Sequence, residues 1–210
     1  MNEAFIWDLD GTVLDSYKVI VPSLYDAAAQ FGLKPDAEEI YRQVITGTVG
    51  DCLKMLAQAA GVPLAVIRPR YEAINAGRAQ DVGLIPGARE ALQALAAKGA
   101  RHFVFTHRGS SALFILRHLG VLDLFGEVVT GEQGFPRKPA PDAVNYLLAK
   151  YDLDREHTYY VGDRNIDTEC AGNAGIKGIL YLPAGSPCTP NGAESLTVQD
   201  LRDICGLIFP

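Results

Sequence analysis

The chain has 210 residues and a formal net charge of −6, from 19 basic and 25 acidic side chains. Its hydrophobic content of 48% is that of a globular protein able to bury a core. The acidic balance and the lack of a basic patch with interleaved aromatic residues argue against nucleic acid or an anionic membrane as a partner.

Other features of the sequence favour a cytoplasmic protein. No positively charged region precedes an apolar run near the start, as a secretory signal would require, and the apolar runs are too short to cross a bilayer. The scattered cysteines form no CxxC pair, which is typical of free thiols in a reducing compartment. They are Cys52, Cys170, Cys188 and Cys205.

The first predicted strand covers residues 4–9, "AFIWDL", and residues 16–81 after it show helical patterns alone. An all-helical stretch inserted after the first strand of a sheet indicates a second, smaller domain. We therefore expect a helical domain at residues 16–82 and an α/β core formed by residues 1–15 and 83–210.

Strands and helices alternate through the rest of the chain. A final covering helix is expected over residues 196–208. Strands that are apolar throughout and alternate with helices predict an α/β fold, with a Rossmann-like parallel sheet and helices on both faces. The remaining predicted strands lie at 101–106, 127–130, 158–163 and 178–183.

Polar side chains lie at or just after the ends of four predicted strands. Because ligands of parallel sheets bind beyond the carboxyl ends of the strands, we expect these side chains to converge on one edge. They are Asp8 and Asp10 with the first strand, Thr106 and His107 with the second, Lys138 with the third, and Asp163 and Asp167 with the fourth.

Such a group suits a phosphate ester bound beside a metal ion. Asp8, Asp10 and Asp163 supply the hard anionic oxygens that Mg²⁺ prefers, and the metal offsets the repulsion between neighbouring carboxylates. Lys138 and Thr106 are suited to hold the remaining oxygens of the phosphate. An aspartate can attack phosphorus, and a second carboxyl two residues on can protonate the leaving oxygen and then activate water.

Four motifs in this order resemble those of the haloacid dehalogenase superfamily of phosphotransferases, and the resemblance covers nearly the whole chain. The helical insertion resembles the small cap of the phosphoglycolate-phosphatase-like branch, which implies a domain that closes over the site, excludes water and screens small substrates. The motifs are "DLDGT" at 8–12, "FTH" at 105–107, "KPAPD" at 138–142 and "GDRNID" at 162–167, with "PGAREAL" at 86–92 as a further similarity.

The resemblance implies catalytic and metal-binding roles for the matching residues. Asp8 is the expected nucleophile and a Mg²⁺ ligand. Asp10 is the expected general acid/base, and its backbone carbonyl is a further ligand of the metal. Asp163 is expected to bind Mg²⁺ and Asp167 to support the metal site, while Lys138 steadies the nucleophile.

The resemblance also implies how the phosphoryl group is held. Thr106 and Lys138 are its expected binding residues, and Gly11 permits the turn of the nucleophile loop. His107 departs from the commonest family pattern, in which asparagine follows the threonine or serine. Its imidazole either bonds the nucleophile loop or the substrate, or points away and leaves only the backbone N–H to the site. We count Gly11 and His107 with the substrate-binding residues.

These features predict a Mg²⁺-dependent phosphatase that hydrolyses a small phosphorylated metabolite through an aspartyl-phosphate intermediate. The substrate is phosphoglycolate-like, a sugar phosphate or a nucleotide, and the protein is a monomer or a homodimer. Asp10 argues against a 2-haloacid dehalogenase, because dehalogenases lack the second aspartate. A phosphomutase similar to β-phosphoglucomutase is the main alternative, but residues 46–51, the expected specificity loop, carry no basic residue. A non-catalytic phosphate-binding protein is the remaining alternative.

Overall fold

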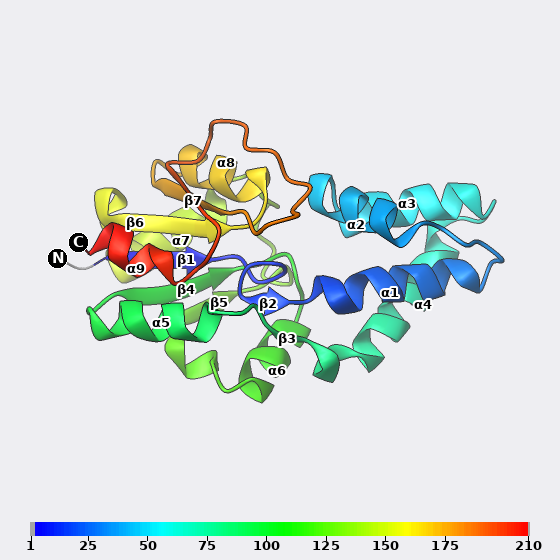
Figure 1. Cartoon of the computed structure of the whole chain (residues 1–210), viewed down its shortest axis with the longest axis horizontal. Coiled ribbons are helices and arrows are strands. Elements are labelled where there is room, and N and C mark those ends of the chain that lie inside the picture. The colour runs from blue at the N-terminus through cyan, green and yellow to red at the C-terminus, as the bar shows by residue number, and fades with distance from the viewer. Residues whose placement is uncertain (1–2, 210) are drawn as a thin grey trace. The chain divides into compact units, whose positions relative to one another are not determined.

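A computed structural model describes residues 3–209 of the chain. The chain divides into two compact units (Figure 1). Met1–Asp15 and Leu84–Pro210 form one of them, here named the core unit, and Ser16–Gly83 form the other, named the helical unit. No helix within residues 3–209 is both long enough and apolar enough to span a membrane.

A six-stranded parallel sheet is the centre of the core unit. Its order, β5-β4-β1-β6-β7-β8, puts β1 in the interior, where Ile6 lies opposite Phe103 of β4 and Tyr160 of β6. β1 is buried along its whole length, as the apolar run in the sequence predicts. The strands are β1 (Ala4–Trp7), β4 (Arg101–Phe105), β5 (Glu127–Val129), β6 (Thr158–Gly162), β7 (Lys177–Tyr181) and β8 (Leu196–Val198).

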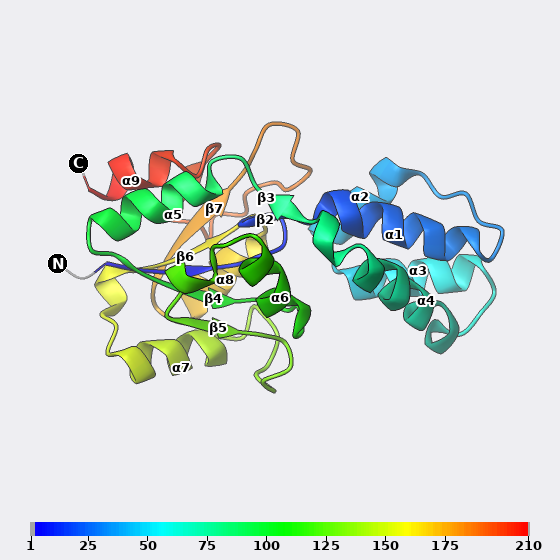
Figure 2. The same ribbon diagram turned by 90° about the horizontal axis from the view of Figure 1, so that it is seen from below.

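Helices cover both faces of this sheet, so the predicted fold class is confirmed. On one face, a hydrophobic cluster joins Ile6 and Phe103 of the sheet with Leu147 of α7 and Ala171 of α8. Figure 2 shows α5 and α9 on the opposite side of the sheet from α7. The helices are α5 (Ala88–Ala97), α6 (Ser111–His118), α7 (Asp142–Tyr151), α8 (Asn165–Asn173) and α9 (Asp203–Ile208), with short 3₁₀ turns at Leu122–Leu124 and Arg155–His157.

The prediction of a single helix over residues 196–208 is wrong. Its first three residues form β8, in which Thr197 pairs with Leu180 of β7, and the helix α9 begins only at Asp203. The run "LTV" is rich in β-branched residues, and Thr197 is exposed while Val198 is buried, as in an edge strand with one covered face. The sheet therefore has six strands rather than the five expected.

The helical unit consists of four helices around its own hydrophobic cluster. Leu24 of α1, Val44 of α2, Leu53 of α3 and Ile67 of α4 are all buried in it. This core is separate from that of the sheet, because each amphipathic helix buries its apolar face against the others. The helices are α1 (Tyr17–Ala29), α2 (Ala37–Thr46), α3 (Val49–Ala59) and α4 (Leu64–Gly77), followed by a 3₁₀ turn at Ala79–Asp81.

The expected glycine loop at residues 46–51 is not an open loop. Only Gly47 and Thr48 separate α2 from α3, because Thr48 acts as the N-cap of α3 and its hydroxyl accepts the Asp51 N–H at 3.0 Å. Sequence reasoning overlooked this cap, although a threonine three residues before an acidic side chain is a signal for a helix start.

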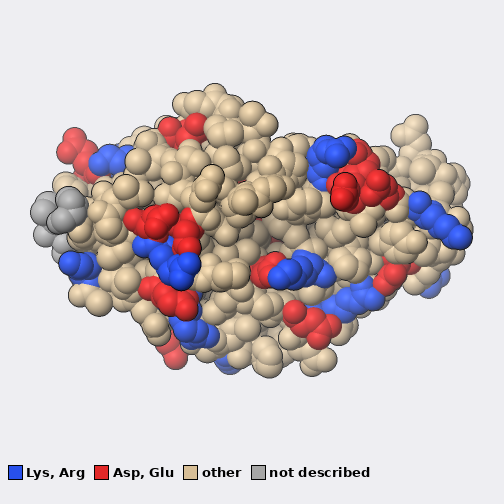
Figure 3. All heavy atoms as spheres, viewed as in Figure 1, with Lys and Arg blue, Asp and Glu red and all other residues tan. Residues whose placement is uncertain are grey.

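A two-stranded sheet formed by β2 (Leu14–Asp15) and β3 (Gly83–Leu84) lies where the chain leaves the core and returns to it. The Ile85 N–H donates to the Val13 carbonyl at 3.0 Å and extends this contact within the core unit. On the face drawn in Figure 3, basic side chains lie beside acidic ones rather than gathering into one patch.

Candidate active site

The site begins where β1 ends. The Asp8 N–H donates to the Val161 carbonyl at 2.9 Å, so Asp8 still follows the sheet, and its side chain is buried. The chain then turns sharply over Leu9, whose carbonyl accepts the N–H groups of three later residues, and Gly11 adopts φ 86°. This left-handed conformation favours glycine, so Gly11 is required by the turn that follows the aspartate.

Lys138 lies fully buried between two carboxylates. Its Nζ donates to Asp8 Oδ1 at 2.6 Å and to Asp167 Oδ1 at 2.6 Å. The rings of Phe105 and Tyr160 flank the ammonium group, each with its centroid 5.5 Å away. A cation held by two anions and two aromatic faces is fixed in place, because the Lys138 side chain is 0% exposed to solvent.

The charges in this cluster change the pKa values of its members. Burial raises the pKa of Asp8 to about 6, with the Asp167 carboxylate adding to this and Lys138 opposing it. Burial alone would lower the pKa of Lys138, but Asp167 and Asp8 outweigh burial and raise it. Lys138 is therefore a permanent cation at neutral pH, and two carboxylates share its single positive charge.

Asp163 and Asp167 reach the cluster from the end of β6 and the first turn of α8. Thr12 donates its hydroxyl proton to Asp163 Oδ1 at 3.3 Å, which links the loop after β1 to the end of β6. Asp167 Oδ2 accepts the Arg164 N–H at 3.2 Å. Gly162 makes this approach possible, because a Cβ at that position would overlap the Asp167 side chain.

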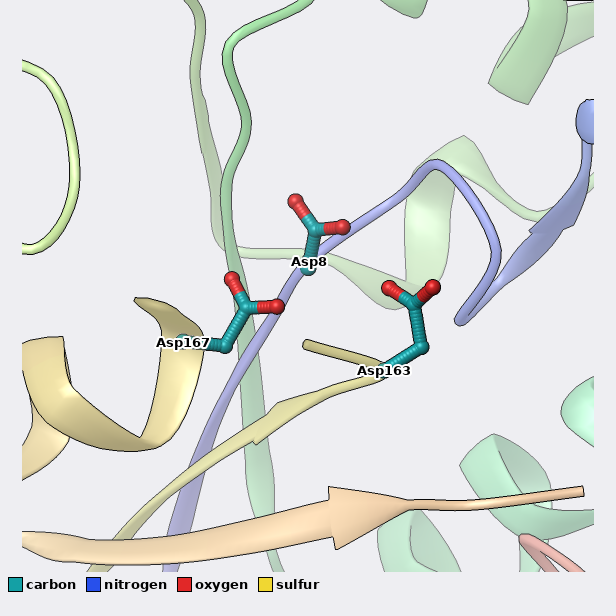
Figure 4. Close-up of side chains that lie close together, drawn as sticks. All are labelled: Asp8, Asp163 and Asp167. Atoms are coloured by element: carbon teal, nitrogen blue, oxygen red, sulfur yellow. The ribbon is translucent and has the colours of Figure 1, made fainter. Parts of the chain in front are cut away.

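The carboxylates of Asp8, Asp163 and Asp167 form a group that fits a divalent cation. Asp8, Asp163 and Asp167 each offer one oxygen, and these oxygens lie within 4.8 Å of one another (Figure 4). Asp8 Oδ2 is buried and has no hydrogen-bond partner among the described residues. Burying an anionic oxygen without a partner is costly, and hard carboxylate oxygens are the ligands that Mg²⁺ prefers. The donor set thus suits Mg²⁺.

The Asp10 carboxylate lies outside this group of three and is bound by Arg108. Arg108 Nη2 lies 2.5 Å from Asp10 Oδ1, and Arg108 Nε lies 3.0 Å from Oδ1 and 3.3 Å from Oδ2. The Arg108 side chain is only 8% exposed. Sequence reasoning gave Arg108 no role. Its only signal is its position, two residues after Thr106 at the end of β4.

Thr106 and His107 directly follow β4, and the structure shows what each contacts. The Thr106 hydroxyl is buried and accepts the Arg108 N–H at 3.1 Å. His107 Nε2 accepts the backbone N–H of Lys138 at 2.8 Å, so its proton lies on Nδ1. Burial and the nearby Lys138 and Arg137 hold the pKa of His107 far below its usual range. The neutral imidazole thus supports the segment that carries Lys138.

The sequence matches the model of one protein family over residues 5–181, described as haloacid dehalogenase-like hydrolase. The chain belongs to this family and is therefore an enzyme of the hydrolase class. The four carboxylates, the threonine and the lysine expected at the strand ends all lie within the matched residues.

Several relatives carry a more specific name. The chain is 32% identical over 191 residues to a phosphoglycolate phosphatase of Rhodobacter capsulatus, covering 86% of this chain and 84% of the relative. It is 29% identical to a phosphoglycolate phosphatase of Rhodospirillum rubrum, covering 84% of this chain and 78% of that one.

Solved structures share the fold. A structure from Haemophilus somnus, described as a predicted phosphoglycolate phosphatase, superposes with a TM-score of 0.84 at 22% identity, over 98% of this chain and 97% of that chain. A hydrolase from Streptococcus pneumoniae is 30% identical and has a TM-score of 0.66, over 86% of this chain and 94% of that chain.

Proposed function

We propose that this hydrolase is a Mg²⁺-dependent phosphatase that acts on a small phosphorylated metabolite, with 2-phosphoglycolate as the first candidate. The observation that carries the proposal is the buried cluster in which Lys138 bonds both Asp8 and Asp167, while Asp8 Oδ2 has no hydrogen-bond partner within residues 3–209. One carboxylate oxygen is thus held by the lysine, and the other is kept for a ligand. The names of the relatives supply the candidate substrate.

We assign the first chemical step to Asp8. Its carboxylate oxygen attacks phosphorus, and the bond between phosphorus and the ester oxygen breaks as the acyl phosphate forms. Lys138 and the Thr106 hydroxyl are suited to hold two phosphoryl oxygens, since both residues are buried and can donate a hydrogen bond. Asp10 gives its proton to the leaving alkoxide, so the alcohol leaves neutral.

The second step returns the enzyme to its starting state. The Asp10 carboxylate takes a proton from water as the water oxygen attacks phosphorus. The bond between phosphorus and Asp8 breaks, which releases inorganic phosphate and restores both carboxyl groups to their original protonation states. The same residue thus serves as acid and then as base, so no further titratable group is needed.

Asp8, Asp163 and Asp167 are the side chains proposed to hold Mg²⁺, together with the backbone carbonyl of Asp10. When bound, the ion would offset the negative charge that the carboxylates and the phosphate bring together. The helical unit is proposed as a cap domain that selects the substrate. Its separate hydrophobic core supports this, because a unit with its own core can move as one body.

The test is phosphate release from a panel of esters, measured with Mg²⁺ and with EDTA. The panel contains 2-phosphoglycolate, sugar phosphates and nucleoside monophosphates. Asp8→Asn keeps the shape of the nucleophile but removes its charge, and Asp123→Asn changes an exposed carboxylate of the core unit as a control. We expect metal-dependent release by the wild type and by Asp123→Asn, and none by Asp8→Asn. Equal release by Asp8→Asn and wild type would refute the assignment, and isomerised sugar phosphates without release would indicate a mutase.

A further inference from the structure

The pair formed by Arg108 and Asp10 is a strong ion pair beside the cluster that the proposed mechanism does not use. The guanidinium makes three N–H contacts to the two Asp10 oxygens, at 2.5, 3.0 and 3.3 Å. The Arg108 side chain is 8% exposed and that of Asp10 is 23% exposed. A charge buried to this degree needs an anionic partner, because a guanidinium left without one would pay a large desolvation cost.

This contact conflicts with the role proposed for Asp10. Under the proposed function, Asp10 must direct one oxygen at the leaving group of the substrate. Both oxygens instead accept N–H groups of Arg108. The reaction therefore requires Arg108 to loosen its hold on Asp10. A guanidinium that gives up one anion in a buried place is stabilised by another, and an anionic substrate can supply it during turnover.

We propose that Arg108 determines specificity by binding a second anionic group of the substrate, a carboxylate, and so releases Asp10 for proton transfer. The released Asp10 carboxylate takes a proton from solvent before the first step and returns one to solvent when its pair with Arg108 re-forms. This inference rests on the proposed function. The planar fork of a guanidinium matches a carboxylate through two parallel hydrogen bonds, so a substrate carboxylate can replace the Asp10 carboxylate like for like.

The covalent structure of 2-phosphoglycolate fits this exchange. One methylene carbon joins its carboxylate to the ester oxygen, which is the leaving atom. Since Arg108 and Asp10 are in direct contact, a carboxylate bound by Arg108 brings the ester oxygen next to the released Asp10 carboxyl. Binding energy from a non-reacting part of the substrate would thus be used to assemble the reacting groups. An ester without the second anion would leave Asp10 bound.

The test compares two substrates that differ only in the second anion. They are 2-phosphoglycolate and 2-hydroxyethyl phosphate, in which a hydroxymethyl group replaces the carboxylate. The variants are Arg108→Gln, which removes the charge, and Arg108→Lys, which keeps the charge but loses the fork. Arg202→Gln is the matched control, because Arg202 also binds an aspartate, Asp200, but is 62% exposed. Circular dichroism and the Tm show whether each variant is folded.

The measured quantity is the ratio of kcat/KM for 2-phosphoglycolate to kcat/KM for 2-hydroxyethyl phosphate. We expect wild type and Arg202→Gln to share a high ratio, and Arg108→Gln to lower it by at least about 30-fold, as for loss of one partner of a buried charge pair. Arg108→Lys should give an intermediate ratio and serves alone if Arg108→Gln does not fold.

Other outcomes would overturn the inference. If Arg108→Gln lowers kcat/KM for both esters equally, Arg108 only positions Asp10 and does not bind the substrate carboxylate. If the wild type hydrolyses other esters without preferring the carboxylate, the inference fails while the proposed function stands. If the wild type releases phosphate from no ester, the proposed function fails and the inference fails with it.

Discussion

His102 should make the stability of the core depend on pH in a way that does not involve the active site. Its Nδ1 accepts the indole N–H of Trp7 at 3.0 Å, and its Nε2 lies 3.1 Å from the Leu92 carbonyl. Because the indole can only donate and the carbonyl can only accept, the imidazole must be neutral with its proton on Nε2. A second proton would point at the Trp7 N–H, so the native contacts exclude it.

The size of the effect follows from the change in pKa. Burial lowers the pKa of His102 from 6.5 to about 4, against a smaller opposing effect of the Leu92 hydrogen bond. At about 1.4 kcal/mol per pH unit, this corresponds to about 3 kcal/mol. The unfolded state binds more protons than the native state between these two pKa values. The stabilisation is therefore complete above pH 6.5 and is lost as the pH falls through this window.

The assay is urea unfolding of the wild type and His102→Gln at a series of pH values. Glutamine does not titrate, and its amide can accept the Trp7 N–H and donate to the Leu92 carbonyl. We expect the free energy of unfolding of the wild type, relative to that of the variant, to be constant above pH 6.5 and to fall by up to about 3 kcal/mol towards pH 4. A difference that stays constant across this range would refute the assignment of a neutral, buried His102.

Substitutions at three other residues test the active-site geometry. Lys138→Met leaves the Asp8 and Asp167 carboxylates buried without their cation. We therefore expect urea unfolding in EDTA to show that the free energy of unfolding falls by about 3–5 kcal/mol. A decrease below about 1 kcal/mol would contradict the buried cluster. His107→Leu removes the acceptor of the Lys138 N–H and should lower the free energy of unfolding by about 1–3 kcal/mol in urea. His107→Gln keeps an acceptor and should lower it less. Equal decreases for the two variants would rule out the acceptor role. Gly162→Ala forces a Cβ into the Asp167 side chain. Thermal unfolding should therefore show a lower Tm and a free energy of unfolding reduced by about 1–3 kcal/mol. An unchanged Tm would contradict this close contact.

Much of the sheet could be predicted from the sequence because interior parallel strands are buried on both faces. Such strands form apolar runs, as in β1 and β6, which pattern reading detects. The edge strand β8 has only three residues and one covered face, so its signal is weak and was overridden by the helical pattern after it. β8 depends on β7, the neighbour that pairs with it, which a local pattern does not contain.

The convergence of Asp8, Asp163 and Asp167 could likewise be expected, because topology brings strand ends to one edge whatever the details of the loops. The contacts of Arg108 and His107 could not. Both side chains lie in a segment without periodic structure, so their directions are set by tertiary contacts with Asp10 and with the Lys138 backbone. The sequence shows which groups are available there, but not which of them face one another.

The stereochemical course at phosphorus tests most directly the central claim that Asp8 is the nucleophile. A substrate ester whose phosphorus is made chiral with sulfur and oxygen isotopes would be hydrolysed in isotopically labelled water, and the configuration of the product determined. Two successive in-line displacements, first by Asp8 and then by water, each invert the centre, so we expect overall retention. Overall inversion would show that water attacks phosphorus directly and would rule out Asp8 as the nucleophile.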